Sequence, residues 1–160
     1  MSSQGIIAPF IEPAAQAEFF ALTNEHTRAD LVRAVYEGMA FSIRDGYDPI
    51  PAAIQEIRLS SGAAKSAFFC QMVADVTGKR VVVPSGSEFG AKGAAMLAAV
   101  GIGWYETIAD ALAFNPAVAK TYERTLESQP LYDAIFATYS DLRDTLRPVW
   151  RRHLQREVHS

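Results

Sequence analysis

Apolar residues recur every three or four positions in the first long patterned stretch of the chain. The repeat consists of Leu31, Val35, Met39 and Ile43. This spacing predicts a helix over 27–45, and Thr27 followed by Asp30 has the form of a capping box at its start. We expect Gly46 to end the helix. Gly38 costs about 1 kcal/mol relative to alanine inside a helix, which suggests that another backbone approaches closely there.

The middle of the chain has a strand-helix-strand pattern. The run "IQEIRL" predicts a strand at 55–60, followed by a helix at 64–77 that ends at Gly78 and by the strand "RVVVP" at 80–84. Such a unit makes its two strands parallel. A second polar turn, "SGSEFG", then leads into the helical run "AKGAAMLAAV", so two polar turns lie at the same end of a small sheet, where α/β proteins usually bind ligands.

The rest of the chain is expected to be helical or irregular. Helices are predicted over 106–113, 117–126 and 130–146. Pro148 should kink or end the last of these, leaving 147–160 as a polar helical tail, and 1–22 should be an extended lead-in. The chain therefore looks like one domain over 1–160.

Composition and charge exclude several classes of protein. The 160 residues are 49% hydrophobic with a formal charge of −3, so we expect no nucleic-acid or membrane partner and a cytoplasmic protein. The four arginines between Arg147 and Glu157 could seek phosphate, but a solvated helix face is the more common use of such a run. Cys70 interrupts no apolar pattern and is expected in the core, and the histidines have no metal-ligand spacing.

The stretch "SSGAAKS" at 60–66 is either a connector or a cradle for an anion at a helix start. It is not a Walker A loop, because Ala64 and Leu59 stand where that motif needs glycine, and the glycines of 86–93 do not have the Rossmann spacing. The second turn leads into a thin helix face that suits tight packing or a flat ligand. That face consists of Gly90, Gly93, Ala94 and Ala98.

Three blocks in order resemble the C-terminal portion of FGGY-family carbohydrate kinases, the group that holds xylulokinase, glycerol kinase and erythritol kinase. They are "APFIEPAAQAEFFALTNEHTRADLVRAVYEGMAFSIRD", "SSGAAKSAFFCQMVADVTGKRVVVP" and "SEFGAKGAAMLAAVGIG". The second is similar to the family's Gly-Gly-Gly-Ala-Lys-Ser block and the third to its Glu-x-Gly-Ala-x-Gly-Ala-Ala block. The tail "YDAIFATYSDLRDTLRPVW" resembles the family's closing tyrosine-rich helix.

The resemblance implies an α/β fold, part of a ribonuclease-H-like, actin-like ATPase lobe, with a small parallel sheet flanked by several helices. It implies ATP or ADP with Mg²⁺ as cofactor and phosphoryl transfer to a sugar or polyol hydroxyl. The nucleotide-binding residues it implies are Ser61, Gly62, Ala63, Ala64, Lys65, Ser66, Glu88, Gly90 and Gly93. The turn from Gly90 to Gly93 would help to form the wall of the adenine pocket.

The chain departs from the family pattern in ways that affect the expected activity. The family's Asp-x-Gly-Thr turn and its catalytic aspartate would lie upstream of Met1, so no catalytic residue is assigned and we expect the chain to be inactive alone. Family glycines are replaced by Ala21 and Ser61, and Gly5-Ile6-Ile7 replaces Gly-Glu-Arg. The alternative is a non-catalytic binding or oligomerisation module on a degenerate kinase scaffold.

A sheet of two strands would leave an edge and a face uncovered. We therefore expect self-association, or pairing with a separate N-terminal kinase lobe.

Overall fold

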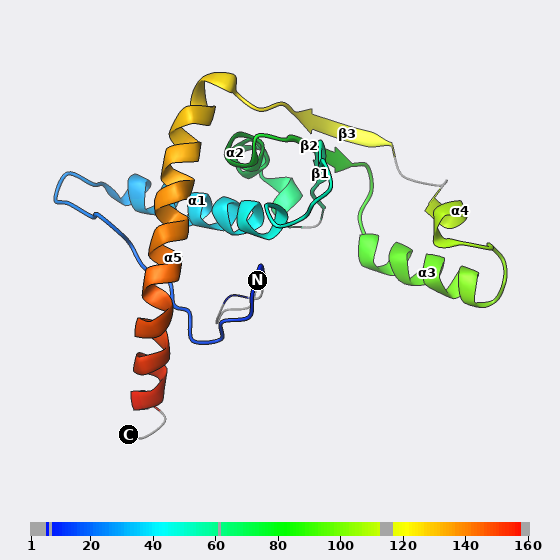
Figure 1. The fold of residues 1–160 in the computed structure, drawn as a ribbon. Coiled ribbons are helices and arrows are strands. Elements are labelled where there is room, and N and C mark those ends of the chain that lie inside the picture. Colours follow the sequence, from blue (N-terminus) through cyan, green and yellow to red (C-terminus); the bar gives the residue numbers. More distant parts are fainter. Residues whose placement is uncertain (1–5, 7, 61, 113–116, 158–160) are drawn as a thin grey trace. The chain divides into compact units, whose positions relative to one another are not determined.

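The computed structural model describes residue 6 and residues 8–60, 62–112 and 117–157 (Figure 1). Its elements in chain order are α1 (Arg28–Tyr47), β1 (Glu56–Arg58), the 3-10 helix η1 (Ala63–Lys65), α2 (Ala67–Thr77), β2 (Arg80–Pro84), α3 (Phe89–Gly101), α4 (Ile108–Leu112), β3 (Val118–Tyr122), the 3-10 helix η2 (Leu126–Ser128) and α5 (Gln129–Glu157). Within these residues, no helix is both long and apolar enough to span a bilayer.

The first helix begins as its sequence predicts. The backbone N–H of Thr27 donates to Asp30 Oδ2 at 2.8 Å, and the N–H of Asp30 donates back to Thr27 Oγ1 at 3.5 Å, which completes the capping box. The predicted stop at Gly46 is wrong by one residue, since α1 runs to Tyr47. The close approach expected at Gly38 is also wrong within the described residues, because no atom lies within 4 Å of the position that a Cβ would take.

The sheet has the order β1-β2-β3. Strands β1 and β2 are parallel, with Ile57 opposite Val81, as the strand-helix-strand pattern predicts. β3 is antiparallel to β2, with Thr121 opposite Val82. The helix predicted over 117–126 and the two-stranded, all-parallel sheet are therefore wrong. Val118, Thr121 and Tyr122 are β-branched or aromatic, and pairing with the otherwise open side of β2 satisfies their backbone groups.

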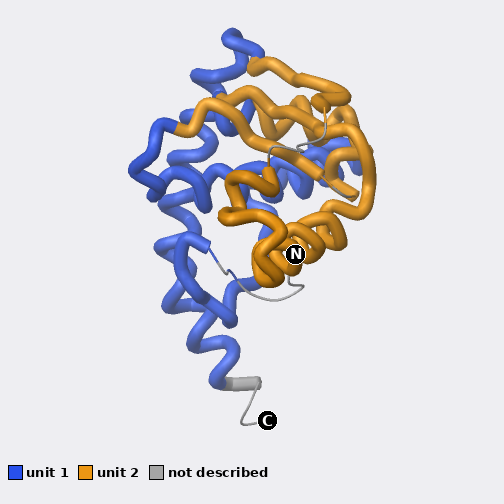
Figure 2. The backbone as a smooth tube through the Cα atoms, turned by 90° about the vertical axis from the view of Figure 1, so that its right-hand side faces the viewer, with its two compact units in different colours: residues 1–53, 75–78, 125–160 blue, residues 54–74, 79–124 orange. Residues whose placement is uncertain are grey.

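The chain divides into two compact units (Figure 2). Unit 1 comprises residues 1–53, 75–78 and 125–160, and unit 2 comprises 54–74 and 79–124. In unit 1 the Phe41 side chain of α1 is only 4% exposed. Its ring centroid lies 6.2, 6.0 and 5.5 Å from those of Tyr132, Phe136 and Tyr139 on α5. These rings form part of the contact between α1 and α5, and such aromatic pairs stabilise beyond the area they bury.

The N-terminal lead-in segment forms ion pairs with α5 within unit 1. Glu12, 1% exposed, pairs with Arg151 at 2.6 Å and Arg147 at 3.7 Å. The guanidinium of Arg147 also lies 4.0 Å from the centre of the Phe10 ring. Two of the four arginines in the basic run therefore bind protein groups. The predicted end near 146 is wrong, because α5 continues through Pro148 to Glu157, but the described part of the predicted tail is helical as expected.

Most of the buried side chains in unit 2 come from the parallel strands and from α2. Ile57, Val81, Cys70 and Val73 are each 2% exposed or less. The core position expected for Cys70 is confirmed, and burial raises the pKa of its thiol. Helices α3 and α4 contact one another in the same unit.

Candidate functional site

The first candidate turn connects β1 to α2. Ser61 lies outside the described residues, and Gly62 begins a short 3-10 helix that covers Ala63–Lys65. Ser66 then caps α2, since the N–H of Phe69 donates to its hydroxyl oxygen at 3.2 Å and the N–H of Cys70 donates to its carbonyl oxygen at 3.0 Å. The α-helix therefore starts three residues later than predicted.

The buried thiol of Cys70 contacts the backbone of this turn. Cys70 Sγ lies 3.9 Å from the carbonyl oxygen of Ala63 and 3.7 Å from that of Ala64, and a thiol is a weak hydrogen-bond donor. Its raised pKa keeps the thiol protonated, as these contacts need. Cys70 therefore helps to hold the two alanines in place, a role that its apolar sequence context did not reveal.

Gly62 does not use the conformational freedom of glycine. Its φ of −60° and ψ of −42° suit any residue. No described atom lies within 4 Å of the place where a Cβ would project. Neither the backbone of the turn nor its packing requires a glycine here, so the missing side chain leaves open space at the start of a helix.

The second candidate turn has an unusual backbone. Glu88 adopts the left-handed conformation, with φ 47°, and its side chain makes no capping hydrogen bond to α3. A non-glycine residue in this region carries a conformational cost of order 1–3 kcal/mol, and such residues are enriched at functional sites. A Cβ added at Gly90 or Gly93 on α3 would meet no described atom within 4 Å, so no described residue packs closely against these two glycines.

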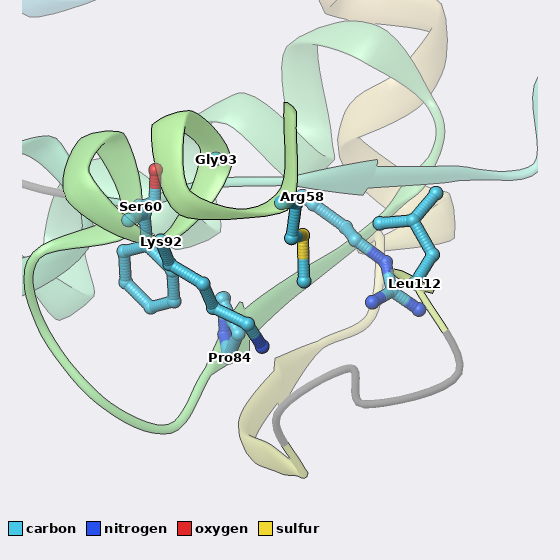
Figure 3. A pocket seen from close by; sticks show the side chains of 8 residues that line it. Arg58, Ser60, Pro84, Lys92, Gly93 and Leu112 are labelled. Carbon is cyan, nitrogen blue, oxygen red and sulfur yellow. The ribbon is translucent and has the colours of Figure 1, made fainter. Parts of the chain in front are cut away.

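A hollow of about 260 Å³ lies where β1 and β2 end and α3 begins (Figure 3). Its wall is formed by Arg58, Ser60, Pro84, Phe89, Lys92, Gly93, Met96 and Leu112. Of the eight candidate residues that the structure describes, only Gly93 belongs to this wall, and Ser60 is the residue before the first turn. The other seven described candidates are not among the lining residues. Ligands in α/β proteins collect at the carboxyl ends of parallel strands, which is where this hollow lies.

Two cationic residues in this wall were not identified from the sequence. Arg58 ends β1 and Lys92 lies in the first turn of α3, and Figure 3 shows both side chains extending beside the hollow. Arg58 Nε pairs with Glu56 at 3.0 Å, and Arg80 pairs with the other oxygen of Glu56 at 2.9 Å. The single carboxylate of Glu56 therefore forms ion pairs with two guanidinium groups. The sequence could have indicated Arg58 and Lys92 only through their positions, since each residue flanks a candidate turn.

The described residues do not supply a metal site. Among them, no three His, Cys, Asp or Glu side chains gather closely enough to hold a metal ion. The arrangement offers an open turn at a helix start, an open helix face and a partly apolar hollow beside positive charge. These features suit an elongated anionic ligand with an apolar part.

Comparison with known proteins identifies the family. Residues 2–102, more than half of the chain, match the C-terminal domain of the FGGY family of carbohydrate kinases. The chain therefore belongs to the FGGY family of carbohydrate kinases, and the predicted family is confirmed.

A sequence relative supports the same assignment. The chain is 32% identical over 152 residues to the erythritol kinase of Brucella abortus (strain 2308), an alignment that covers 94% of this chain and 29% of that protein. The chain thus spans less than a third of the length of this relative.

Solved structures confirm the α/β fold class. The ligand-bound xylulose kinase from Lactobacillus acidophilus matches with a TM-score of 0.79 at 23% identity, over 91% of this chain and 30% of that one. The Plasmodium falciparum glycerol kinase with ADP matches with a TM-score of 0.68 at 20% identity, over 89% of this chain and 29% of that one. The fold is that of the C-terminal part of these kinases.

Proposed function

We propose that this chain forms the nucleotide side of an ATP-dependent sugar or polyol kinase. The turn at 61–66 would face the adenosine and phosphates, and Glu88, Gly90 and Gly93 would help to wall the base. Membership of the FGGY family supports the reaction class, and the glycerol kinase that shares the fold was crystallised with ADP. The acceptor would be a hydroxyl group of a small sugar or polyol.

The open glycine at position 62 is the observation that carries this proposal. Glycines that the fold itself requires are recognisable here, because Gly78 and Gly86 have φ of +67° and +109°. Gly62 has an ordinary φ and empty space beside it. A turn residue without a side chain allows a phosphate or ribose to approach the backbone of the turn closely.

The chemistry that the cofactor supplies is transfer of its terminal phosphoryl group, with Mg²⁺ neutralising the phosphate charge. The described residues fit the nucleotide through the open turn and the neighbouring positive charge. They contain no carboxylate cluster for Mg²⁺. The metal would therefore arrive with the nucleotide, and this chain's own part would be to bind and orient the phosphates.

Phosphoryl transfer would require a second lobe. None of the described residues is assigned as the base that would accept the hydroxyl proton, so we expect no turnover by the chain alone. β1 and β3 are the two edge strands of the described sheet, and an unpaired edge favours association with another polypeptide. The partner would be an N-terminal kinase lobe or a second copy of the chain.

A complementation assay tests this function. The chain would be mixed with a separately produced N-terminal part of the Brucella abortus erythritol kinase, and ATP consumption would be measured with erythritol, xylulose or glycerol. We expect turnover in the mixture and none from either part. Turnover by the chain alone would contradict the proposal. If the mixture consumes no ATP and the chain binds no nucleotide, the alternative of a non-catalytic scaffold would be favoured.

A further inference from the structure

The hollow at the ends of β1 and β2 combines an apolar wall with positive charge. Phe89, Met96 and Leu112 supply apolar surface, while Arg58 and Lys92 come from different elements of the same wall (Figure 3). Its volume of about 260 Å³ lies just below the roughly 300–1,000 Å³ of typical ligand pockets. It can therefore receive part of a nucleotide rather than all of it.

The charge beside this hollow is not fully neutralised at the β1 side. Arg58 and Arg80 share the single carboxylate of Glu56. The Arg58 side chain remains 50% exposed, so it can turn toward a ligand without losing much burial. A guanidinium group recognises phosphate in a bidentate manner, and the Lys92 ammonium adds a second, more flexible donor.

We infer that Arg58 and Lys92 bind the phosphate chain of the nucleotide. This inference rests on the proposed function and assigns a role to two residues outside the turns that the sequence indicated. Ser60 lines the hollow and lies two residues before Gly62 in the chain, so we expect one extended ligand to contact both. The phosphates pass between the two cations, and the open turn at Gly62 contacts the same ligand.

Paired titrations with adenosine and Mg-ADP test this role, because the two ligands differ in the phosphates. The variants are Arg58→Gln and Lys92→Gln, with Arg152→Gln on α5 as a control that removes the same charge from an exposed position in unit 1. We expect each hollow variant to weaken Mg-ADP binding roughly threefold to fivefold, the range of half-exposed ion pairs. Adenosine binding should change less than twofold in every variant, and the control should match the wild type.

The result separates this inference from the proposed function. Unchanged Mg-ADP affinity in both hollow variants, or equal weakening of adenosine and Mg-ADP, would overturn the phosphate role and leave the proposed function standing. A wild-type chain that binds neither ligand would overturn both. If Arg58→Gln does not fold, judged by its circular dichroism, Arg58→Lys keeps the charge but loses the bidentate guanidinium, so it should weaken Mg-ADP binding while leaving adenosine binding unchanged. Unchanged Mg-ADP affinity in Arg58→Lys would overturn bidentate recognition by Arg58.

Discussion

Alanine at two glycines should change stability in opposite directions. Gly78 follows α2 in the left-handed conformation, with φ +67°. An added Cβ there would lie 2.8 Å from Gln129 Oε1, closer than ordinary contact. Gly38 lies inside α1, where a Cβ would meet no described atom within 4 Å. The same chemical change therefore strains one site and improves helix propensity at the other.

The magnitudes follow from these environments. At Gly78 the left-handed backbone costs alanine about 1–2 kcal/mol. The added Cβ would displace the Gln129 side chain and break the hydrogen bond from its Nε2 to Asp133 Oδ1 at 3.1 Å. Such a bond contributes about 0.5–1.5 kcal/mol to stability. Alanine also restricts the unfolded chain, which offsets about 0.4–1 kcal/mol of this cost and leaves a net loss of roughly 0.5–3 kcal/mol. Gly38→Ala should gain about 0.8–1.0 kcal/mol, because a helix interior favours alanine.

Equilibrium unfolding in urea, followed by circular dichroism at 222 nm, measures both effects against the wild type. We expect a lower midpoint for Gly78→Ala and a higher one for Gly38→Ala, with unchanged slopes. A stabilised Gly78→Ala would refute the assigned backbone conformation. A destabilised Gly38→Ala would show that something approaches this glycine that the described residues do not contain.

Two further substitutions test the lead-in segment. The hydrogen bond from Arg151 holds the pKa of Glu12 below its ordinary value of roughly 4.3. The ionised carboxylate therefore stabilises the fold above that pH. This contribution is lost as the pH falls through the lowered pKa of the folded state. The stability advantage of wild type over Glu12→Gln should therefore be constant from pH 7 to about 5 and shrink toward pH 3; an advantage independent of pH would contradict the pairing. Ala21 has φ +57° where the family pattern has glycine, so Ala21→Gly should raise the unfolding free energy by about 0.5–1 kcal/mol, and a loss in the same urea titration would count against that backbone.

Local signals predicted the elements that depend on local physics. The Thr27-Asp30 pair fixed the start of α1 because both partners lie within one helical turn. The parallel β1-β2 pair followed from its strand-helix-strand pattern, and Gly78 ends α2 in the left-handed form that favours glycine. Each of these features is decided by residues close together in the chain.

Features that depend on distant partners were missed. The segment Val118–Tyr122 becomes a strand because its backbone pairs with β2, which lies more than thirty residues away in sequence. Pro148 does not end α5, whose residues before and after it pair with Glu12 through Arg147 and Arg151. The hollow beside Arg58 and Lys92 was missed because the meeting of β1, β2 and α3 is tertiary, and neither residue belongs to the turns that the sequence marked.

The central claim is that the turn at 61–66 binds nucleotide, and calorimetric titration of the chain with Mg-ADP tests it most directly. Gly62→Val would fill the open space beside the turn, while Gly38→Val makes the same change at an open glycine in unit 1. We expect saturable binding by the wild type and by Gly38→Val, and its loss in Gly62→Val. Equal binding by all three proteins, or no binding by the wild type at millimolar nucleotide, would contradict it.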